Sequence, residues 1–540
     1  MNFLRLGAFA LLLLNLFSAF CFSEENGYSP ILEHRMKANE MVQMLREERY
    51  SEVDAFLQST HEKHLQTVDG STSLNLLYDY ISGHNELTEE ILKRWRDSSP
   101  QSHFAYTVSG YFYIHYAWKA RGSEWADKVA SEMWPLFKAR ILLAKFYLEQ
   151  AYQMDSSDPN SSTFLITVCR GLSLKRKIME NYFQRAIQAD PTFFDAYFEK
   201  LQYLMPKWQG SKKKMFRFAM RAALEAPQHS AIPLVLAYAH DEMADRSGDR
   251  NKYLSDPKVW NDIEAVFEKF FETSPKCNSR RTMFAQLAID AGKLELAKKH
   301  LDLVISYYPK SYTPYYERGR YFMVLKEYQK AIEDFTKAIE MFPSYEEAYT
   351  KRGVSHVRLG EYEAALNDFS KAIELDPRNE YGLSQIGSIY LSKKDYKQAI
   401  NFCSKAVEID DKDTLAFSSR AYAYSMINDF QKALKDYQRV MEITDQHEYI
   451  FSNMGYVYVK LEQPEKALEY FKKAIQYNPD DQYAQRWFSS VKQRLSKSGE
   501  VKRVVEVKKL TPSFFDILRV ILMVLLLGTF VGIRLKRKKI

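Results

Sequence analysis

The strongest constraint in this sequence is a pattern of 34 residues that is repeated six times between Asn278 and Asp481. Every row has a small residue at its eighth position and an alanine at its twentieth position. The eighth positions are Ala285, Gly319, Gly353, Gly387, Ala421 and Gly455, and the twentieth positions are Ala297, Ala331, Ala365, Ala399, Ala433 and Ala467. Two helices need small residues where their backbones approach most closely. The pattern therefore predicts an all-α stack of helical hairpins.

Two further columns of the same rows agree with closely packed helices. The fourth column is bulky in most rows, and prolines close four of the rows: Tyr315, Tyr349, Leu383, Phe417 and Phe451, then Pro309, Pro343, Pro377 and Pro479. These prolines predict helix ends, because proline cannot donate the backbone hydrogen bond of a helix interior. The period and its columns together resemble the tetratricopeptide repeat, a helix-turn-helix unit. The resemblance implies a right-handed α-solenoid over residues 278–481 that binds other protein chains rather than performing chemistry.

Residues 24–277 are predicted to be helical, but without clean repeats. Apolar residues recur at spacings of three and four, which is typical of helices, in Ile31–Leu57, Glu89–Arg96, Phe104–Ala120 and Trp134–Met154. Three segments that end shortly before a proline resemble the second helix of a repeat, namely Met179–Ala189, Met215–Glu225 and Asp262–Thr273. We interpret the region as degenerate helical hairpins that continue the solenoid and cap it.

Two stretches of this region resemble a bacterial domain family of unknown function that often precedes tetratricopeptide repeats. The first contains Trp95, Ser99-Pro100-Gln101-Ser102, Ala105 and Ala117–Gly122, and the second is Leu204–Ser211. The resemblance covers roughly residues 35–275 and implies a bacterial origin and an envelope or secreted setting, but no known activity. We interpret Pro206–Ser211 as an interhelix turn in which Ser211 caps the next helix. The alternative is a binding loop that presents Trp208.

The N-terminus is predicted to direct export of the chain. Residues 1–23 are expected to form a secretory signal, because Arg5 precedes the apolar stretch Leu6–Phe20 and polar residues follow. A lipoprotein signal acylated at Cys21 and an uncleaved anchor are the alternatives. All three interpretations export the chain after Glu24.

The C-terminus is predicted to anchor the chain in a membrane. We expect residues 482–495 to form a helix that caps the last repeat and residues 496–512 to form a basic linker. Residues 513–533 are predicted to span the bilayer as an apolar helix. A helix lying on the surface is disfavoured, because residues 520–533 have no polar face. Basic residues flank the segment on both sides, so the signal decides the orientation and places residues 534–540 in the cytoplasm as a basic tail.

Neither the composition nor the motifs predict nucleic-acid binding, catalysis or a metal site. The formal net charge of +7 is modest and lies largely near the C-terminus, which argues against nucleic-acid binding. We predict no catalytic residue, no cofactor and no small-molecule substrate, because no phosphate loop or nucleophile motif appears. His61 and His64 are three residues apart and are interpreted as a surface pair rather than metal ligands. The cysteines are widely separated, so no disulfide framework or zinc site is expected, and Cys403 is predicted to be a buried, inert thiol.

The binding groove is predicted from the first helix of each repeat. In this family, positions 2, 5, 9, 12 and 13 of the row face the groove. Positions 5 and 9 are Thr282/Gln286, Tyr316/Arg320, Thr350/Val354, Ser384/Ser388, Ser418/Tyr422 and Ser452/Tyr456, and position 2 adds Tyr381 and Tyr449. The Lys and Asn clamp with which chaperone-binding members hold a C-terminal carboxylate is absent. The predicted partner-binding residues are therefore Tyr316, Arg320, Tyr381, Tyr422, Tyr449 and Tyr456.

This lining suggests the kind of partner. Tyrosine offers a large contact area at low entropic cost, and small hydroxyls can bond a peptide backbone. We hypothesise that the groove holds an extended, largely uncharged segment of a partner protein. The alternative is that these tyrosines only pack between adjacent repeats.

The sequence is thus interpreted as a membrane-anchored, non-catalytic interaction scaffold on the exported side of a membrane. In a bacterium this means the inner membrane with the solenoid in the periplasm, in envelope assembly or quality control. A second interpretation is an endoplasmic reticulum adaptor or co-chaperone, since Lys536–Ile540 resembles a retrieval signal and Asn160-Ser161-Ser162 is a glycosylation sequon. A third interpretation places an enzyme in residues 30–275, with the repeats recruiting its substrate.

Overall fold

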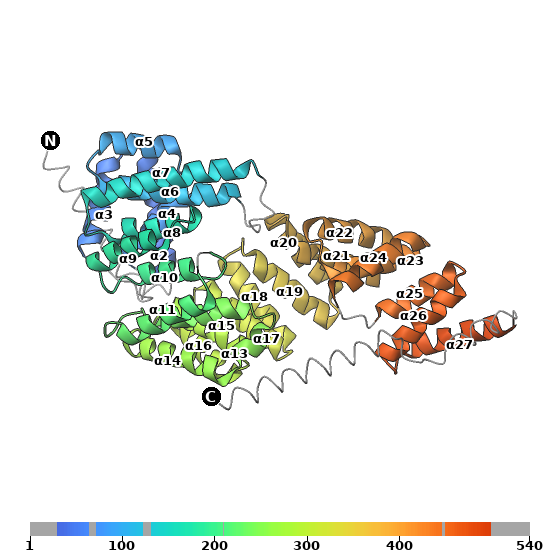
Figure 1. The fold of residues 1–540 in the computed structure, drawn as a ribbon. Coiled ribbons are helices and arrows are strands. Elements are labelled where there is room, and N and C mark those ends of the chain that lie inside the picture. The colour runs from blue at the N-terminus through green and yellow to red at the C-terminus, as the bar shows by residue number, and fades with distance from the viewer. Residues whose placement is uncertain (1–29, 64–71, 122–130, 209, 445–448, 498–540) are drawn as a thin grey trace, which may run out of the picture. The chain divides into compact units, whose positions relative to one another are not determined.

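The computed structural model describes residues 30–63, 72–121, 131–208, 210–444 and 449–497. The chain divides into two compact units, Met1–Leu359 and Gly360–Ile540, which are called unit 1 and unit 2 below. Both units are built from α-helices (Figure 1). The division falls within the repeats, after the first helix of the third row.

The part of unit 1 that precedes the repeats contains helices of very different length. They are α2 (Pro30–Arg46), α3 (Tyr50–Glu62), α4 (Ser73–Ser82), α5 (Glu89–Ser98), α6 (His103–Arg121), α7 (Met133–Met154), α8 (Pro159–Gly171), α9 (Arg176–Ala189), α10 (Phe194–Leu204), α11 (Lys212–Glu225), α12 (Leu234–Asp245), α13 (Arg250–Leu254) and α14 (Pro257–Thr273). The long helices α6 and α7 pack along each other (Figure 1). Helix α8 is buried from Pro159 to Cys169 and packs against α6, α7, α9 and α10.

The helices predicted in this part of unit 1 are found, with differences where the chain turns. The apolar run Ile31–Leu57 is broken into α2 and α3 at Glu48, which has a left-handed backbone with φ of 60°. Ser211 caps α11 by accepting a hydrogen bond from the Lys214 amide at 3.3 Å. Trp208 packs edge-on against Trp118, with ring centroids 5.7 Å apart. The Pro206–Ser211 motif is therefore an interhelix turn, and its tryptophan packs inside the unit.

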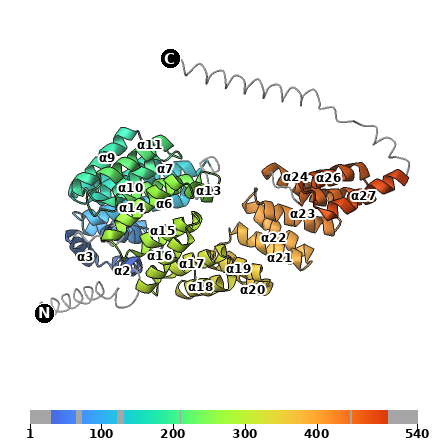
Figure 2. The ribbon, with the colours of Figure 1, turned by 90° about the horizontal axis from the view of Figure 1, so that it is seen from below.

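Each row of 34 residues holds two helices (Figure 2). The rows contain α15 (Asn278–Asp290), α16 (Leu294–Tyr307), α17 (Tyr312–Val324), α18 (Tyr328–Met341), α19 (Glu346–Leu359), α20 (Tyr362–Leu375), α21 (Glu380–Ser392), α22 (Tyr396–Ile409), α23 (Thr414–Met426), α24 (Phe430–Ile443), α25 (Ile450–Lys460) and α26 (Pro464–Tyr477). Helix α27 (Gln482–Lys497) follows and packs on α25 and α26. The chain is a tetratricopeptide-type helical solenoid, as the period predicted.

The small-residue columns are explained by side chains that lie directly against the backbone. A Cβ atom added to Gly319 would lie 2.6 Å from the Phe335 ring, and one added to Gly455 would lie 2.7 Å from the Phe471 ring. Carbon atoms at such distances overlap, so any larger residue would force the two helices of the hairpin apart. Phe335 and Phe471 are themselves fully buried.

The turn between the two helices of a row uses the same backbone in every row. Its fifteenth position has positive φ throughout, although the residue type varies: Gly292, Lys326, Gly360, Lys394, Asn428 and Glu462. In a Schellman motif, the amide after such a residue bonds a carbonyl five residues earlier. Glu327 bonds Phe322 in this way at 2.9 Å, and Gln463 bonds Tyr458 at 3.0 Å.

The predicted terminal segments lie outside the described residues. These are the signal at residues 1–23, most of the linker at 496–512, the membrane helix at 513–533 and the tail at 534–540. Among the helices that the structure describes, none has the length and apolar character needed to cross a membrane.

Candidate functional site

The fifth position of the row, predicted to line the groove, is mostly buried. Ser384 and Ser452 are almost inaccessible, and each donates a hydrogen bond to the aspartate at the end of its own row, Asp413 and Asp481 respectively. Asp413 in turn caps the next helix by accepting from the Ala416 amide at 2.9 Å. These serine hydroxyls therefore join neighbouring repeats and are already used within the chain.

In unit 2, the tyrosines at the second and ninth positions remain accessible. The side chains of Tyr381, Tyr422 and Tyr449 are 43%, 38% and 68% exposed. Tyr483 is 44% exposed and lies 34 residues after Tyr449, so α27 continues the second-position column beyond the last full row. Sequence analysis missed Tyr483 because α27 was considered only as a cap.

Several of these side chains form one surface, which we call the tyrosine face and define as Tyr422, Tyr456, Tyr483 and Trp487. The Tyr456 and Trp487 rings meet edge to face with centroids 5.6 Å apart, and the Tyr483 and Trp487 centroids are 6.3 Å apart. Partial burial raises the pKa of Tyr483 to about 12, and the hydroxyls of Tyr456 and Tyr422 lie close enough to add to this shift. The Tyr483 phenol is therefore neutral at physiological pH and can both donate and accept hydrogen bonds.

In unit 1, the predicted groove residues Tyr316 and Arg320 have different environments. The Tyr316 ring is buried and packs against Phe335 and Tyr345, at centroid distances of 5.7 Å and 4.9 Å. Burial raises the pKa of Tyr316 well above its ordinary value, and nearby Glu317 adds to the shift. At this position the tyrosine packs between helices, as the alternative interpretation supposed.

Arg320 belongs to a chain of ion pairs, which we call the charge network and define as Glu317, Arg320, Asp290, Arg250 and Asp241. Arg320 donates to Glu317 at 2.6 Å and to Asp290 at 3.1 Å. Arg250 donates to Asp290 at 2.8 Å and to Asp241 at 2.6 Å. Burial raises the pKa of Glu317 even though the adjacent Arg320 favours its charged form.

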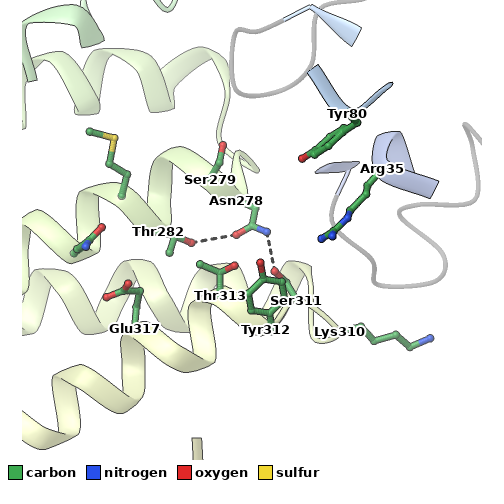
Figure 3. A pocket seen from close by; sticks show the side chains of 12 residues that line it. Arg35, Tyr80, Asn278, Ser279, Thr282, Lys310, Ser311, Tyr312, Thr313 and Glu317 are labelled. Carbon is green, nitrogen blue, oxygen red and sulfur yellow. Dashed lines mark hydrogen bonds between the residues drawn. The ribbon is translucent and has the colours of Figure 1, made fainter. Parts of the chain in front are cut away.

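A pocket of about 310 Å³ lies beside these groups in unit 1 (Figure 3). Its lining includes Asn278 and Thr282 on α15, Thr313 on α17, Arg35 on α2 and Tyr80 on α4. Figure 3 shows Arg35 and Tyr80 reaching in from the side opposite Thr282 and Thr313. The N-terminal helices thus form one wall of the pocket on the first two repeats.

Two polar side chains of α15 in this pocket, Asn278 and Thr282, already have partners. Asn278 donates from Nδ2 to Ser311 Oγ at 3.0 Å, and Thr282 donates to Asn278 Oδ1 at 3.1 Å (Figure 3). Sequence reasoning missed Arg35 and Tyr80, because the pattern of the repeats carries no information about which distant helix covers them.

Cys403 and His61 differ in how well their environments match the sequence predictions. Cys403 is buried, and burial raises the pKa of its thiol to about 12, which fits an inert thiol. His61 is not on the surface, since its side chain is only 11% exposed and lies 3.3 Å from Asp155. Its predicted neighbour His64 lies outside the described residues. In the ranges that the structure describes, no three His, Cys, Asp or Glu side chains are placed to hold a metal ion.

Family models match both halves of the chain. A model described as "Domain of unknown function (DUF4034)" matches residues 37–155, a shorter region than the one predicted from the motifs. Models of the tetratricopeptide repeat match residues 313–345, 346–379, 382–413 and 449–481. No curated protein matches the chain.

Solved structures resemble parts of the chain. YrrB, described as a tetratricopeptide repeat protein with an unusual peptide-binding site, is 26% identical over 34% of this chain and 96% of YrrB, with a TM-score of 0.31. PilF of Pseudomonas aeruginosa is 16% identical over 39% of this chain and 97% of PilF, with a TM-score of 0.37. The Cut9–Hcn1 hetero-tetramer of APC/C contributes a chain that is 13% identical over 81% of this chain and 96% of its own length, with a TM-score of 0.38. The family models and the helical hairpins together make this chain a tetratricopeptide repeat protein with an N-terminal DUF4034 domain.

Proposed function

We propose that this protein is an exported, membrane-anchored scaffold whose tyrosine face holds an extended, largely uncharged segment of a partner protein. The observation that carries the proposal is the exposure of Tyr422 beside Tyr456, Tyr483 and Trp487. Aromatic groups with a hydrogen-bonding end are favoured at protein interfaces, and a polar but neutral surface suits a polar but neutral ligand.

The pairing of Arg420, from a first helix of unit 2, supports the same ligand class. Arg420, on α23, is already paired within unit 2. It donates to both oxygens of Asp436, at 2.8 Å and 2.9 Å. Such bidentate pairs are strong and specific. An acidic segment would have to compete with Asp436 for this guanidinium.

The proposal includes the cellular location of the scaffold and its attachment to a membrane. An N-terminal signal over residues 1–23 and an apolar segment over residues 513–533 support export of both units and anchoring by the C-terminus. In a bacterium, both units would then lie in the periplasm, where envelope assembly or quality control would supply the partner. The rival endoplasmic reticulum interpretation loses one support, because the Asn160 side chain of the glycosylation sequon is buried in the folded domain.

Peptide selection from a random display library, followed by fluorescence anisotropy, tests the ligand class. The selected peptides should carry few charges, and combined Tyr422→Ala and Tyr456→Ala substitutions should weaken binding at least tenfold. Tyr362→Ala is the matched control, since Tyr362 is 39% exposed and lies on α20, which is the second helix of its row. Binding that survives the double substitution, or that is lost equally in the control, would refute the role of the tyrosine face.

Reporter fusions test whether the protein is exported and anchored in a membrane. An alkaline phosphatase fused after Lys497 should be active only if unit 2 is exported, and removal of residues 498–540 should release the protein from membranes. A phosphatase that stays inactive when residues 1–23 are intact would contradict export.

A further inference from the structure

A second cavity, which we call the polar cavity, lies in unit 1 among helices α3, α8 and the turn after α9. Its volume is about 280 Å³, and its polar lining groups are Thr60, His61, Thr72, Ser157, Asn160, Asp190 and Thr192. These residues come from segments that are far apart in the sequence and that meet only in the folded domain. The cavity shares no residue with the tyrosine face or with the pocket of Figure 3.

Asn160 is one of the lining residues, and its side chain carries a buried acceptor without a partner. Its side chain is 1% exposed, and its Nδ2 donates to Asp158 Oδ1 at 2.7 Å. A carboxylate only accepts hydrogen bonds, so the amide must present its NH₂ group to Asp158 and turn its oxygen the other way. That oxygen, Asn160 Oδ1, receives no hydrogen bond from the described part of the chain.

The position of Asn160 is held by the start of α8. Asp158 caps this helix by accepting from the Asn160 amide at 2.9 Å, and Pro159 follows as the first helical residue. Tyr78, which is fully buried, donates to Asp158 Oδ2 at 2.9 Å and fixes the carboxylate from the other side. The unpaired oxygen therefore belongs to a rigid element and cannot rotate toward solvent.

The charges around the cavity are predominantly negative. Asp190 lines it and accepts from the Thr192 amide at 2.8 Å and from the Thr192 hydroxyl at 2.7 Å, both through Oδ1. Asp155 lies behind Ser157, and hydrogen bonds from Ser157 hold the pKa of Asp155 below its ordinary value against the effect of burial. No arginine or lysine is among the described residues that line the cavity.

Two histidines lie beside the Asp155 carboxylate. His61 Nε2 lies 3.3 Å from Asp155 Oδ2, and His103 Nε2 lies 3.4 Å from the same oxygen. Burial lowers the pKa of His103, although Asp158 and Asp155 oppose that shift, so the ring is mainly neutral at pH 7. Among the described lining residues, Asp190 therefore supplies a carboxylate charge that His103 does not offset.

The geometry argues for binding rather than catalysis by a serine relay. Ser157 Oγ lies 3.4 Å from His61 Nε2, the same nitrogen that faces Asp155. In a Ser-His-Asp relay, the serine and the aspartate contact different nitrogens of the imidazole. Ser157 also donates to Asp155 Oδ1 at 2.6 Å, which keeps its proton on the carboxylate side.

We propose that the polar cavity binds a small organic cation of the amine class, with its ammonium held between Asn160 Oδ1 and the Asp190 carboxylate. An ammonium only donates hydrogen bonds, so it satisfies both acceptors and compensates the charge at once. An anion would be repelled by Asp190 and Asp155, and a neutral alcohol would leave the charge uncompensated. The proposal does not depend on the tyrosine face.

Isothermal titration of the full chain with 1,4-diaminobutane and with ethylamine tests the proposal, and 1,4-butanediol serves as the uncharged control ligand. At least one amine should bind at physiological salt, and the diol should not. Asp190→Asn should weaken amine binding at least tenfold while keeping the Oδ1 acceptor of the turn. Asn160→Ala should weaken it to a similar extent.

Asp410→Asn is the matched control variant. Asp410 follows α22 as Asp190 follows α9, and it accepts from the Lys412 amide at 3.0 Å in the same kind of turn. Amine binding by Asp410→Asn should equal that of the unaltered chain. If Asn160→Ala does not fold, as judged by circular dichroism, Asp190→Asn alone decides the result.

Three results would overturn the proposal. If neither amine binds at millimolar concentration, the cavity holds water only. If the diol binds as tightly as the diamine, the ligand is neutral and the carboxylate is not what selects it. If Asp190→Asn binds the diamine as well as Asp410→Asn does, the amine binds elsewhere on the surface.

Discussion

The first helices of the first two repeats and those of the last three derive from the same 34-residue pattern, yet they present different surfaces. In unit 1, the N-terminal helices bring Arg35 and Tyr80 over α15 and α17, and the ninth-position Arg320 is held by the charge network. In unit 2, the ninth-position Tyr422 is exposed beside Tyr483. The difference shows that the repeat fixes the hairpin, whereas its neighbours decide which positions are free to bind.

The largest expected effect distinguishes the two kinds of tyrosine. Tyr316→Ala should destabilise unit 1 by about 3 kcal/mol, because it removes a buried ring that packs on Phe335 and Tyr345. Tyr422→Ala should cost less than about 1 kcal/mol, because its ring is partly in water. Hydrogen exchange of peptides from α17 and α23 measures each effect in its own unit. Equal losses would mean that Tyr422 is a packing residue too.

The next effect concerns the charge network. Asp290→Ala should cost about 2 kcal/mol, because Arg250 and Arg320 each lose a charged partner but keep another carboxylate. Ser392 occupies the same column in unit 2 and is exposed, so Ser392→Ala should change stability by less than about 0.5 kcal/mol. Urea unfolding followed by tryptophan fluorescence gives the comparison. If Asp290→Ala leaves the free energy of unfolding unchanged, the charge network adds nothing to stability.

A smaller effect depends on pH and should be confined to unit 1. Arg281 donates to His300 Nδ1 at 3.0 Å, and burial and Arg281 lower the pKa of His300 to about 4. The unfolded chain, with a pKa of about 6.5, binds the proton more readily. The stability from neutral His300 is therefore complete above pH 6.5 and is lost as the pH falls toward 4.

His300→Gln keeps an acceptor for Arg281 but cannot titrate, so it should reduce the loss of stability between pH 7 and 5. The reduction should be about 1 kcal/mol after solvent screening. Melting curves at several pH values measure it, and the difference between the two proteins separates His300 from the other histidines of the chain. If both proteins lose the same stability between pH 7 and pH 5, His300 is not the source of the pH dependence.

The smallest effect tests how firmly the N-terminal helices hold the first repeats. The Arg35 guanidinium lies 5.9 Å from the centre of the Phe342 ring. Its replacement by alanine should cost less than about 1 kcal/mol, as expected for an exposed cation–π contact. Lys460→Ala is the counterpart in unit 2, where the ammonium lies 5.4 Å from the Tyr456 ring. A much larger cost for Arg35 would show that α2 is essential for holding the repeats.

The sequence was sufficient for the hairpins because their constraints are local. Gly319 and Gly455 are small for the reason predicted, since Phe335 and Phe471 lie against their backbones. The roles of polar side chains could not be predicted, because they depend on partners from other elements. Ser452 appeared free in the row pattern, yet it donates to Asp481. Asn160 appeared to be a glycosylation site, yet the folding of α8 buries it beside Asp158.

The shared turn at the fifteenth position has a consequence for how such a chain can change in length. The left-handed residue occurs at Lys326 and Glu462 as well as at Gly292, so the turn is imposed by the packing of its two helices and does not require glycine. Insertion of one residue into a helix would rotate every later contact by about 100°. Insertion of a whole row would repeat an interface that already exists. Homologous lineages should therefore differ in steps of 34 residues, with the two ends of the chain carried along unchanged.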